Sequence, residues 1–212
     1  MTIELCFATR AERRKTLPGD ELVPSPLGSV THAVTINAPP ELVWPWLVQL
    51  GSGRAGWYSY DHVDNGGVPS ARKVVAELQH VAVGDVMPWL PGAQDGFVVG
   101  EVTPERALVL VVPLQRSVLD SVASAPRLRA SWALVLEPVN SDRTRLIARS
   151  RPSRDWLAIQ DYNTPGRPLP IERAYDFMAK LPRPLLLPLA ACGHYVMESR
   201  MLRGVKSRAE RS

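Results

Sequence analysis

The pattern of hydrophobic positions predicts a strand and then a helix in the first quarter of the chain. Residues 29–38 alternate with a period of two, as in a β-strand. One face of this strand carries Val30, His32, Val34 and Ile36. Two prolines at 39–40 then start a helix, because proline is tolerated in a first turn whose amides are unpaired anyway. Apolar residues recur there at helical spacing, from Val43 to Leu50, and Gly51 ends the helix.

A run of strands occupies the middle of the sequence. Apolar and polar residues form extended segments separated by turn residues, at 80–90, 96–102, 106–112, 129–139 and 143–151. Asn140, Ser141 and Asp142 give a hairpin signal between the last two segments. Consecutive hairpins of this kind predict an antiparallel meander and not a parallel sheet.

The last expected element is a long helix from about Pro188 to Ala209. Its apolar stripe carries Ala190, His194, Met197, Met201 and Val205, and the opposite face carries Glu198, Arg203 and Lys206. We expect this helix to cover the concave face of a curved sheet, since no other element is long enough. Residues 152–182 are rich in proline and predict at most a short helix around 171–180.

Composition limits the class of protein. A chain of 212 residues with 45% hydrophobic and 22% charged residues fits one globular domain, which we place at 28–212, with a polar extension at 1–27 packed on it. Cys6 and Cys192 lack metal-ligand spacing, and no secretory leader is apparent, so we expect free thiols and a cytoplasmic location. The longest apolar stretch, 184–192, is far shorter than the roughly 20 residues of a membrane span, so no integral membrane segment is expected.

The net charge of +4 is concentrated near the end of the chain, in Arg200, Arg203, Lys206, Arg208 and Arg211. A helix C-terminus favours positive side chains, so we interpret this group as a solvated helix end. Weak contact with acidic partners is the alternative. Nucleic acid is not an expected partner, because the basic residues do not alternate with exposed aromatic ones.

Residues 51–56, Gly-Ser-Gly-Arg-Ala-Gly, match the G-x-G-x-x-G pattern of dinucleotide-binding proteins. That pattern indicates a nucleotide site only between a strand and a helix, whose N-terminus then holds the pyrophosphate. Here it follows a helix and precedes Trp-Tyr-Ser-Tyr. We therefore interpret the glycines as a helix end and a tight turn.

Several stretches carry the motifs of a known superfamily. Residues 36–51 begin Ile-Asn-Ala-Pro-Pro-Glu, residues 53–61 are Gly-Arg-Ala-Gly-Trp-Tyr-Ser-Tyr-Asp, and residues 131–138, 144–149 and 194–210 continue the match. These stretches resemble the SRPBCC (START/Bet v 1-like, polyketide cyclase/dehydrase) superfamily and one of its bacterial subgroups, although Ala55 stands where the subgroup usually has glycine. The resemblance implies an α+β helix-grip fold, a curved antiparallel sheet wrapped around a long C-terminal helix with a cavity between them. It implies no single activity, because the superfamily includes carriers, receptors, aromatases and cyclases.

We expect the cavity to bind an apolar or amphipathic small molecule, lipid-like or polyketide-like. The alternative is an enzyme of the cyclase, aromatase or dehydratase type, with Tyr60, His194 and Asp61 as acids or bases. His32 and His194 would meet across the cavity if both faced inward. No cofactor or metal is expected, and no nucleophile motif is found.

Ligand-binding candidates are aromatic residues with polar tips, basic residues and flexible apolar ones: Arg54, Trp57, Tyr58, Trp132, Arg149, Met197 and Met201. Such side chains suit an amphipathic ligand, because they offer contact area together with a directed hydrogen bond. The structural alternative is that Arg54 pairs with Asp61 or a carbonyl and that the rings fill the end of the core. Of Trp132 and Arg149, we expect one to face the concave side of the sheet.

Overall fold

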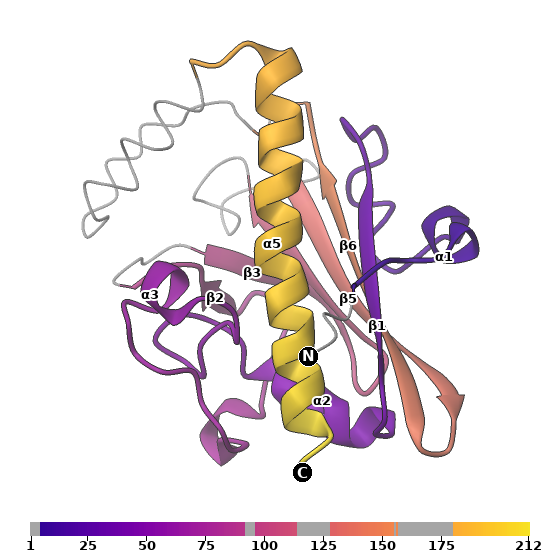
Figure 1. The fold of residues 1–212 in the computed structure, drawn as a ribbon, viewed down its shortest axis with the longest axis vertical. Coiled ribbons are helices and arrows are strands. Elements are labelled where there is room, and N and C mark those ends of the chain that lie inside the picture. Colours follow the sequence, from indigo (N-terminus) through magenta and orange to yellow (C-terminus); the bar gives the residue numbers. More distant parts are fainter. Residues whose placement is uncertain (1–4, 92–95, 114–127, 155, 157–179) are drawn as a thin grey trace.

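Six antiparallel strands form one sheet in the order β1-β6-β5-β4-β3-β2 (Figure 1). The structure is a computed structural model that describes residues 5–91, 96–113, 128–154, 156 and 180–212. The strands are β1 (Val30–Ile36), β2 (Val86–Pro88), β3 (Gly96–Thr103), β4 (Ala107–Pro113), β5 (Leu128–Asn140) and β6 (Arg143–Pro152). Strands β2 to β6 form the predicted meander, and β1 pairs with β6, the last strand in the sequence.

The long helix α5 (Arg183–Ala209) runs across one face of this sheet (Figure 1). It begins before Pro188, because Pro184 lies in the first turn, where no amide hydrogen bond is lost, and Pro188 gives up a single bond. The other described helices are α1 (Arg10–Arg14), α2 (Pro40–Val48), α3 (Asp61–Asp64) and the 3-10 turn η1 (Ala76–Leu78). None of the helices in the described ranges is long and apolar enough to cross a membrane. The chain has the helix-grip fold that the resemblance implies.

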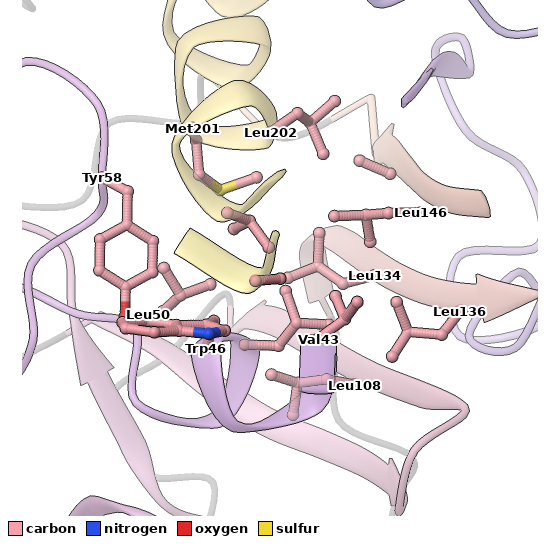
Figure 2. Close-up of a cluster of buried hydrophobic side chains, with 14 of the residues drawn as sticks. Val43, Trp46, Leu50, Tyr58, Leu108, Leu134, Leu136, Leu146, Met201 and Leu202 are labelled. Carbon is pink, nitrogen blue, oxygen red and sulfur yellow. The ribbon is translucent and has the colours of Figure 1, made fainter. Parts of the chain in front are cut away.

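The main core lies between the sheet, α2 and the C-terminal half of α5, as Figure 2 shows. We call this side of the sheet the helix face. Its buried side chains include Val43, Trp46, Leu50, Leu108, Leu134, Leu146, Met201 and Leu202. These side chains form one cluster of buried residues in this half of the interface, so the expected cavity does not occupy it. Met201, a ligand-binding candidate, is 2% exposed and belongs to this core.

The N-terminal segment covers the opposite side of the sheet, which we call the outer face. Leu17 packs there against sheet residues such as Val135 and Ile147. Backbone pairing adds to this packing, because the amide of Ala33 donates to the carbonyl of Cys6 at 3.3 Å. Residues 5–27 thus bury the outer face of the central strands.

Arg149 also lies on the outer face, which corrects the expectation that it binds a ligand inside the fold. Successive strand residues alternate between faces. Because Ala148 points toward α5, its neighbour Arg149 points away from α5. The guanidinium is 3% exposed, and its Nη1 is 2.7 Å from Asp20 Oδ2 and 2.7 Å from the carbonyl of Lys15. Nε donates to Thr31 Oγ1 at 3.1 Å. Arg149 therefore anchors the N-terminal segment.

One predicted strand is shorter in the structure, and one predicted helix lies outside the described residues. Only Val86–Pro88 of the expected strand at 80–90 pairs with β3. Gly84, with φ of +97°, and the bond from the amide of Ala82 to Asp85 Oδ2 at 2.8 Å form a turn just before it. The short helix expected around 171–180 falls almost wholly on residues that are not described.

A close approach between α5 and the loop after α2 explains a glycine near the C-terminal end of the long helix. A Cβ atom at Gly204 would lie 2.3 Å from the carbonyl oxygen of Tyr58, a residue with φ of +57°. Earlier in the same loop, Gly51 and Gly56 exchange backbone hydrogen bonds at 2.9 and 3.2 Å. The glycines of the G-x-G-x-x-G pattern thus form a tight turn after a helix, as interpreted from the sequence.

We expect Gly204→Ala to lower the free energy of unfolding by about 1–3 kcal/mol, because the backbone of Tyr58 has to move away. Gly193→Ala is the matched control on the same helix, since a Cβ there meets nothing within 4 Å. It is expected to raise stability by up to about 1 kcal/mol, through helix propensity. Urea denaturation of both variants measures the contrast, and equal effects would contradict the close approach.

Candidate functional site

A buried carboxylate on α5 is the centre of the candidate site. Glu198 is 3% exposed, and its Oε2 contacts Nδ1 of His32. Its Oε1 accepts a hydrogen bond from Trp132 Nε1 at 2.7 Å and lies 3.4 Å from His194 Nε2. We call His32, Trp132, His194 and Glu198 the Glu198 cluster. It joins residues from the first strand, the fifth strand and the final helix.

The sheet positions these side chains through the alternation of its strands. β6 lies between β1 and β5, so His32 and Trp132 approach α5 from the two sides of β6. The β6 residues that face α5 between them are small, Ala148 opposite His32 and Ser150 opposite Trp132. Ser150 Oγ lies 3.1 Å from His194 Nε2. Small side chains on β6, between His32 and Trp132, thus leave room for the imidazole of His194 from α5.

The surroundings of Glu198 favour its ionised form. Burial alone would raise the pKa of this carboxyl, but hydrogen bonds and charge interactions with His194 and His32 lower the pKa to about 2. Burial likewise works to lower the pKa of His194, and its contact with Glu198 outweighs this and raises the pKa above its ordinary value. The site therefore combines a buried negative charge with two imidazoles. Their rings are 5.9 Å apart, so the two histidines do meet.

Four aromatic rings lie beside this charge. We call Trp57, Trp89, Phe97 and Trp132 the aromatic cluster. Phe97 is the central ring, with centroid distances of 5.5 Å to Trp57, 5.2 Å to Trp132 and 6.0 Å to Trp89. Trp57 is held by a hydrogen bond from its Nε1 to the carbonyl of Pro88 at 3.2 Å. Phe97 and Trp132 are only partly buried, so this apolar surface is in part accessible.

Two other ligand-binding candidates, Arg54 and Tyr58, have structural contacts. Arg54 donates to the carbonyls of Val48 and Leu50 at 2.9 and 3.0 Å, so it caps the end of α2 and does not pair with Asp61. The hydroxyl of Tyr58 accepts a hydrogen bond from Gln49 at 2.7 Å, and burial raises the pKa of Tyr58 to about 12. These contacts match the structural alternative for both residues.

Asp61 borders a separate polar pocket of about 170 Å³. The pocket is lined by Tyr58, Ser59, Asp61, Ser70, Arg200, Arg203, Gly204, Ser207 and Arg208. The Asp61 carboxylate accepts hydrogen bonds from the amide and hydroxyl of Ser70. Tyr60 is 41% exposed, with the Arg200 guanidinium 6.0 Å from its ring centre. Of the three expected catalytic residues, only His194 therefore belongs to the Glu198 cluster.

Met197 lies next to the same loop. Ser59 Oγ is 3.2 Å from the carbonyl oxygen of Met197 and 3.9 Å from its sulfur. The structure thus places Met197 at the contact between α5 and the loop, whereas Trp57 and Trp132 lie in the aromatic cluster.

Sequence reasoning missed Glu198, Trp89 and Phe97. The sequence pattern predicts Glu198 on the polar face of the last helix, because it is an acid. Its position four residues after His194 is the available signal, since side chains at i and i+4 lie on the same side of a helix. Phe97 carries a weaker signal, an aromatic residue in a predicted strand, and Trp89 precedes a turn with no distinguishing pattern.

Asp64, in the short helix α3, is a buried acid whose surroundings disfavour its ionised form. It is 6% exposed, and its Oδ1 has no hydrogen-bond partner among the described residues. Burial and the nearby charge of Asp61 raise the pKa of Asp64 from 3.8 to about 6. The folded protein therefore binds this proton more tightly than the unfolded chain does.

We expect Asp64→Asn to be more stable than the wild type above pH 6. The stability that the protonated acid contributes is fully present below pH 3.8 and is lost as the pH rises through 6. The gain at pH 8 is expected to be about 3 kcal/mol, and it should shrink toward pH 4. Urea denaturation at the two pH values measures it. A gain of the same size at both would contradict the raised pKa.

The fold and the site together define a helix-grip protein in which the Glu198 cluster on the final helix adjoins the aromatic cluster through Trp132. No family model matches the sequence. No curated protein matches it at a significant level.

Solved structures with a similar arrangement exist. A protein from Mesorhizobium loti, determined by a structural genomics consortium, aligns with 87% of this chain and 98% of its own, with 15% identity and a TM-score of 0.40. The Zhui aromatase/cyclase from a Streptomyces species aligns over 87% and 94%, with 16% identity and a TM-score of 0.34. Norcoclaurine synthase from Thalictrum flavum aligns over 84% and 97%, with 15% identity and a TM-score of 0.30. Similarity at this level transfers no ligand or activity to this chain.

Proposed function

We propose that the protein binds a flat, amphipathic small molecule against the aromatic cluster, with the polar end of the molecule toward the Glu198 cluster. One observation carries this proposal. The ring of Trp132 packs against Trp57 and Phe97, while its N–H donates to Glu198. An apolar platform and a fixed polar group are thereby joined through one side chain, which is the combination that ligand sites use for affinity and orientation.

The accessibility of the rings supports binding over a purely structural role. Trp57 is 6% exposed and serves as the buried base of the cluster, whereas Phe97 and Trp132 are partly open. Aromatic faces pair with a planar partner in offset-stacked or edge-to-face geometry, which adds to the free energy from buried area. A planar ligand therefore fits this surface better than a flexible acyl chain does.

The enzyme alternative depends on an acid or base next to the aromatic cluster. His194 is in that position, through its contact with Glu198. Tyr60 and Asp61, the other expected catalytic residues, contact Arg200 and Ser70 instead. Two of the three groups named for that alternative are therefore not beside the rings, and binding is the function that we propose.

A dye titration tests the proposal. The planar aromatic anion 8-anilinonaphthalene-1-sulfonate should bind with 1:1 stoichiometry and accept energy from the tryptophans. Phe97→Ala is expected to weaken binding about tenfold, a loss of about 1.4 kcal/mol, because it removes the central ring. Trp44→Phe, at a tryptophan on α2 outside the aromatic cluster, is the matched control and should bind as the wild type does.

Equal affinity in the two variants, with near-UV circular dichroism showing both to be folded, would overturn the proposal. Native mass spectrometry of protein purified from its host identifies the natural occupant. A bound planar metabolite that is lost in Phe97→Ala is the expected result.

A further inference from the structure

Three side chains of the Glu198 cluster present metal-ligand atoms to one small region. One ring nitrogen of His32, one of His194 and a carboxylate oxygen of Glu198 all lie within 4.8 Å of one another. The atoms that contact Glu198 are Nδ1 of His32 and Nε2 of His194. The side chains of His32 and Glu198 are 9% and 2% exposed, and that of His194 is 35% exposed. The donor set is therefore enclosed on the strand side and open at His194.

The spacing of these atoms suits a divalent transition metal. Bonds of 2.0–2.1 Å to zinc place tetrahedral ligand atoms about 3.3 Å apart. His194 Nε2 and Glu198 Oε1 are 3.4 Å apart, and the two residues are one helical turn apart on α5. His32 supplies the third donor from β1. Two ligands on one turn of a helix and a third from a facing strand thus surround one point, and the direct contact between His32 Nδ1 and Glu198 Oε2 has to open when an ion enters.

The surrounding side chains hold the ligands in orientation. Trp132 donates its N–H to Glu198 Oε1 at 2.7 Å. Ser150 Oγ lies 3.1 Å from His194 Nε2 in the metal-free protein, and it gives up this contact when that nitrogen ligates the ion. The ring of Tyr195 packs edge-on against His32 at 5.0 Å. Hydrogen bonds to ligating carboxylates and packing around ligating imidazoles are the usual supports of protein metal sites.

We propose that His32, His194 and Glu198 form a binding site for one divalent first-row transition metal ion, with Zn²⁺ as the representative ion. Two imidazoles and a carboxylate are a ligand set of zinc sites that keep one coordination position open. That position takes water or an oxygen atom of a bound molecule. The positive ion also compensates the buried carboxylate, which is costly to hold in the protein interior without a nearby cation.

The proposal goes beyond the binding of a small molecule, and the two are tested separately. Metal titrations use protein without dye, and dye titrations use protein freed of metal by a chelator. Failure of Zn²⁺ binding leaves the aromatic platform untouched, and failure of dye binding leaves the ligand set untouched.

Calorimetric titration of the chelator-treated full chain with Zn²⁺ is the test. We expect one equivalent to bind, and Co²⁺ in its place to give visible absorption bands of a low-coordinate site. Glu198→Gln, which preserves volume, and His194→Ala, which removes a partly exposed ring, should each weaken Zn²⁺ binding at least about tenfold. His80→Ala is the matched control, because it removes an exposed histidine that is not part of the Glu198 cluster. The Zn²⁺ affinity of this variant should equal that of the wild type.

Trp132→Phe separates the ligands from their support. It leaves all three donors in place and removes the N–H that orients Glu198, so Zn²⁺ affinity is expected to fall about tenfold. Absence of saturable Zn²⁺ binding by the wild type overturns the proposal. Unchanged Zn²⁺ affinity in His194→Ala also overturns it. This variant keeps the test decisive if Glu198→Gln does not fold, and far-UV circular dichroism checks that His194→Ala itself is folded.

Discussion

Arg149→Met is expected to lower the free energy of unfolding by about 3–5 kcal/mol, because it leaves the carboxylate of Asp20 without its closest cation. The Asp20 side chain is 13% exposed, and Arg151, its other cation, is 3.6 Å away. The same substitution removes hydrogen bonds to the carbonyls of Lys15 and Glu12 and to the hydroxyl of Thr31. The N-terminal segment thereby loses its anchor on the outer face.

Urea denaturation measures this loss, and two further variants show its cause. Arg149→Met combined with Asp20→Asn should recover part of the stability, since the buried carboxylate is removed together with its closest cation, and Arg151 loses only the more distant contact at 3.6 Å. Arg143→Met, at an exposed arginine of the same strand, should stay within about 0.5 kcal/mol of the wild type. A small effect of Arg149→Met on stability together with weaker dye binding would restore the ligand-binding role expected from the sequence.

His32→Leu is expected to destabilise the metal-free protein by about 3 kcal/mol, because Glu198 then keeps its charge without its closest contact. Adding Glu198→Met should recover most of this loss. An apolar pair of similar volume needs no compensating charge. The hydrogen bonds that it leaves unmade belong to Trp132 and His194, which are both partly exposed.

The comparison of these single and double variants shows what the Glu198 cluster is for. A double variant as stable as the wild type, with Zn²⁺ and dye binding lost or weakened, would mean that the cluster does not serve folding. A double variant less stable than His32→Leu alone would contradict this expectation and make the cluster a structural element. Chemical denaturation in the presence of chelator keeps the comparison free of bound metal.

The faces of the strands could be predicted from the sequence, because alternation is a local property. The period of two placed His32 and Val34 on one face, and it placed Trp132 and Leu134 on one face of another strand. All four face α5 in the structure, or pack against the core beneath it. The family resemblance added the order of elements and the final helix.

The partners of these residues could not be predicted, because they depend on contacts between distant parts of the chain. His32 and Glu198 are 166 positions apart, and hydropathy alone assigned Glu198 to solvent. The face of the sheet on which Arg149 lies is ambiguous from the sequence for a related reason, since a buried arginine is stable only where a carboxylate faces it. That carboxylate, Asp20, lies in a segment without periodicity. The tight contact at Gly204 likewise follows from the path of a loop and not from the helix that contains it.

The position of β1 in the sheet has a consequence for the order of folding. Strands β2 to β6 each pair with a neighbour in sequence, whereas β1 pairs Val30 with Ser150 and Ile36 with Thr144. Closing so long a loop has a higher entropic cost than forming a hairpin, so we expect β1 to dock after the hairpin of β5 and β6 has formed. His32 arrives with that strand. A transient detachment of this one edge strand would therefore dismantle the Glu198 cluster while the meander and α5 stay folded, and amide hydrogen exchange in β1 would report how often the site is complete.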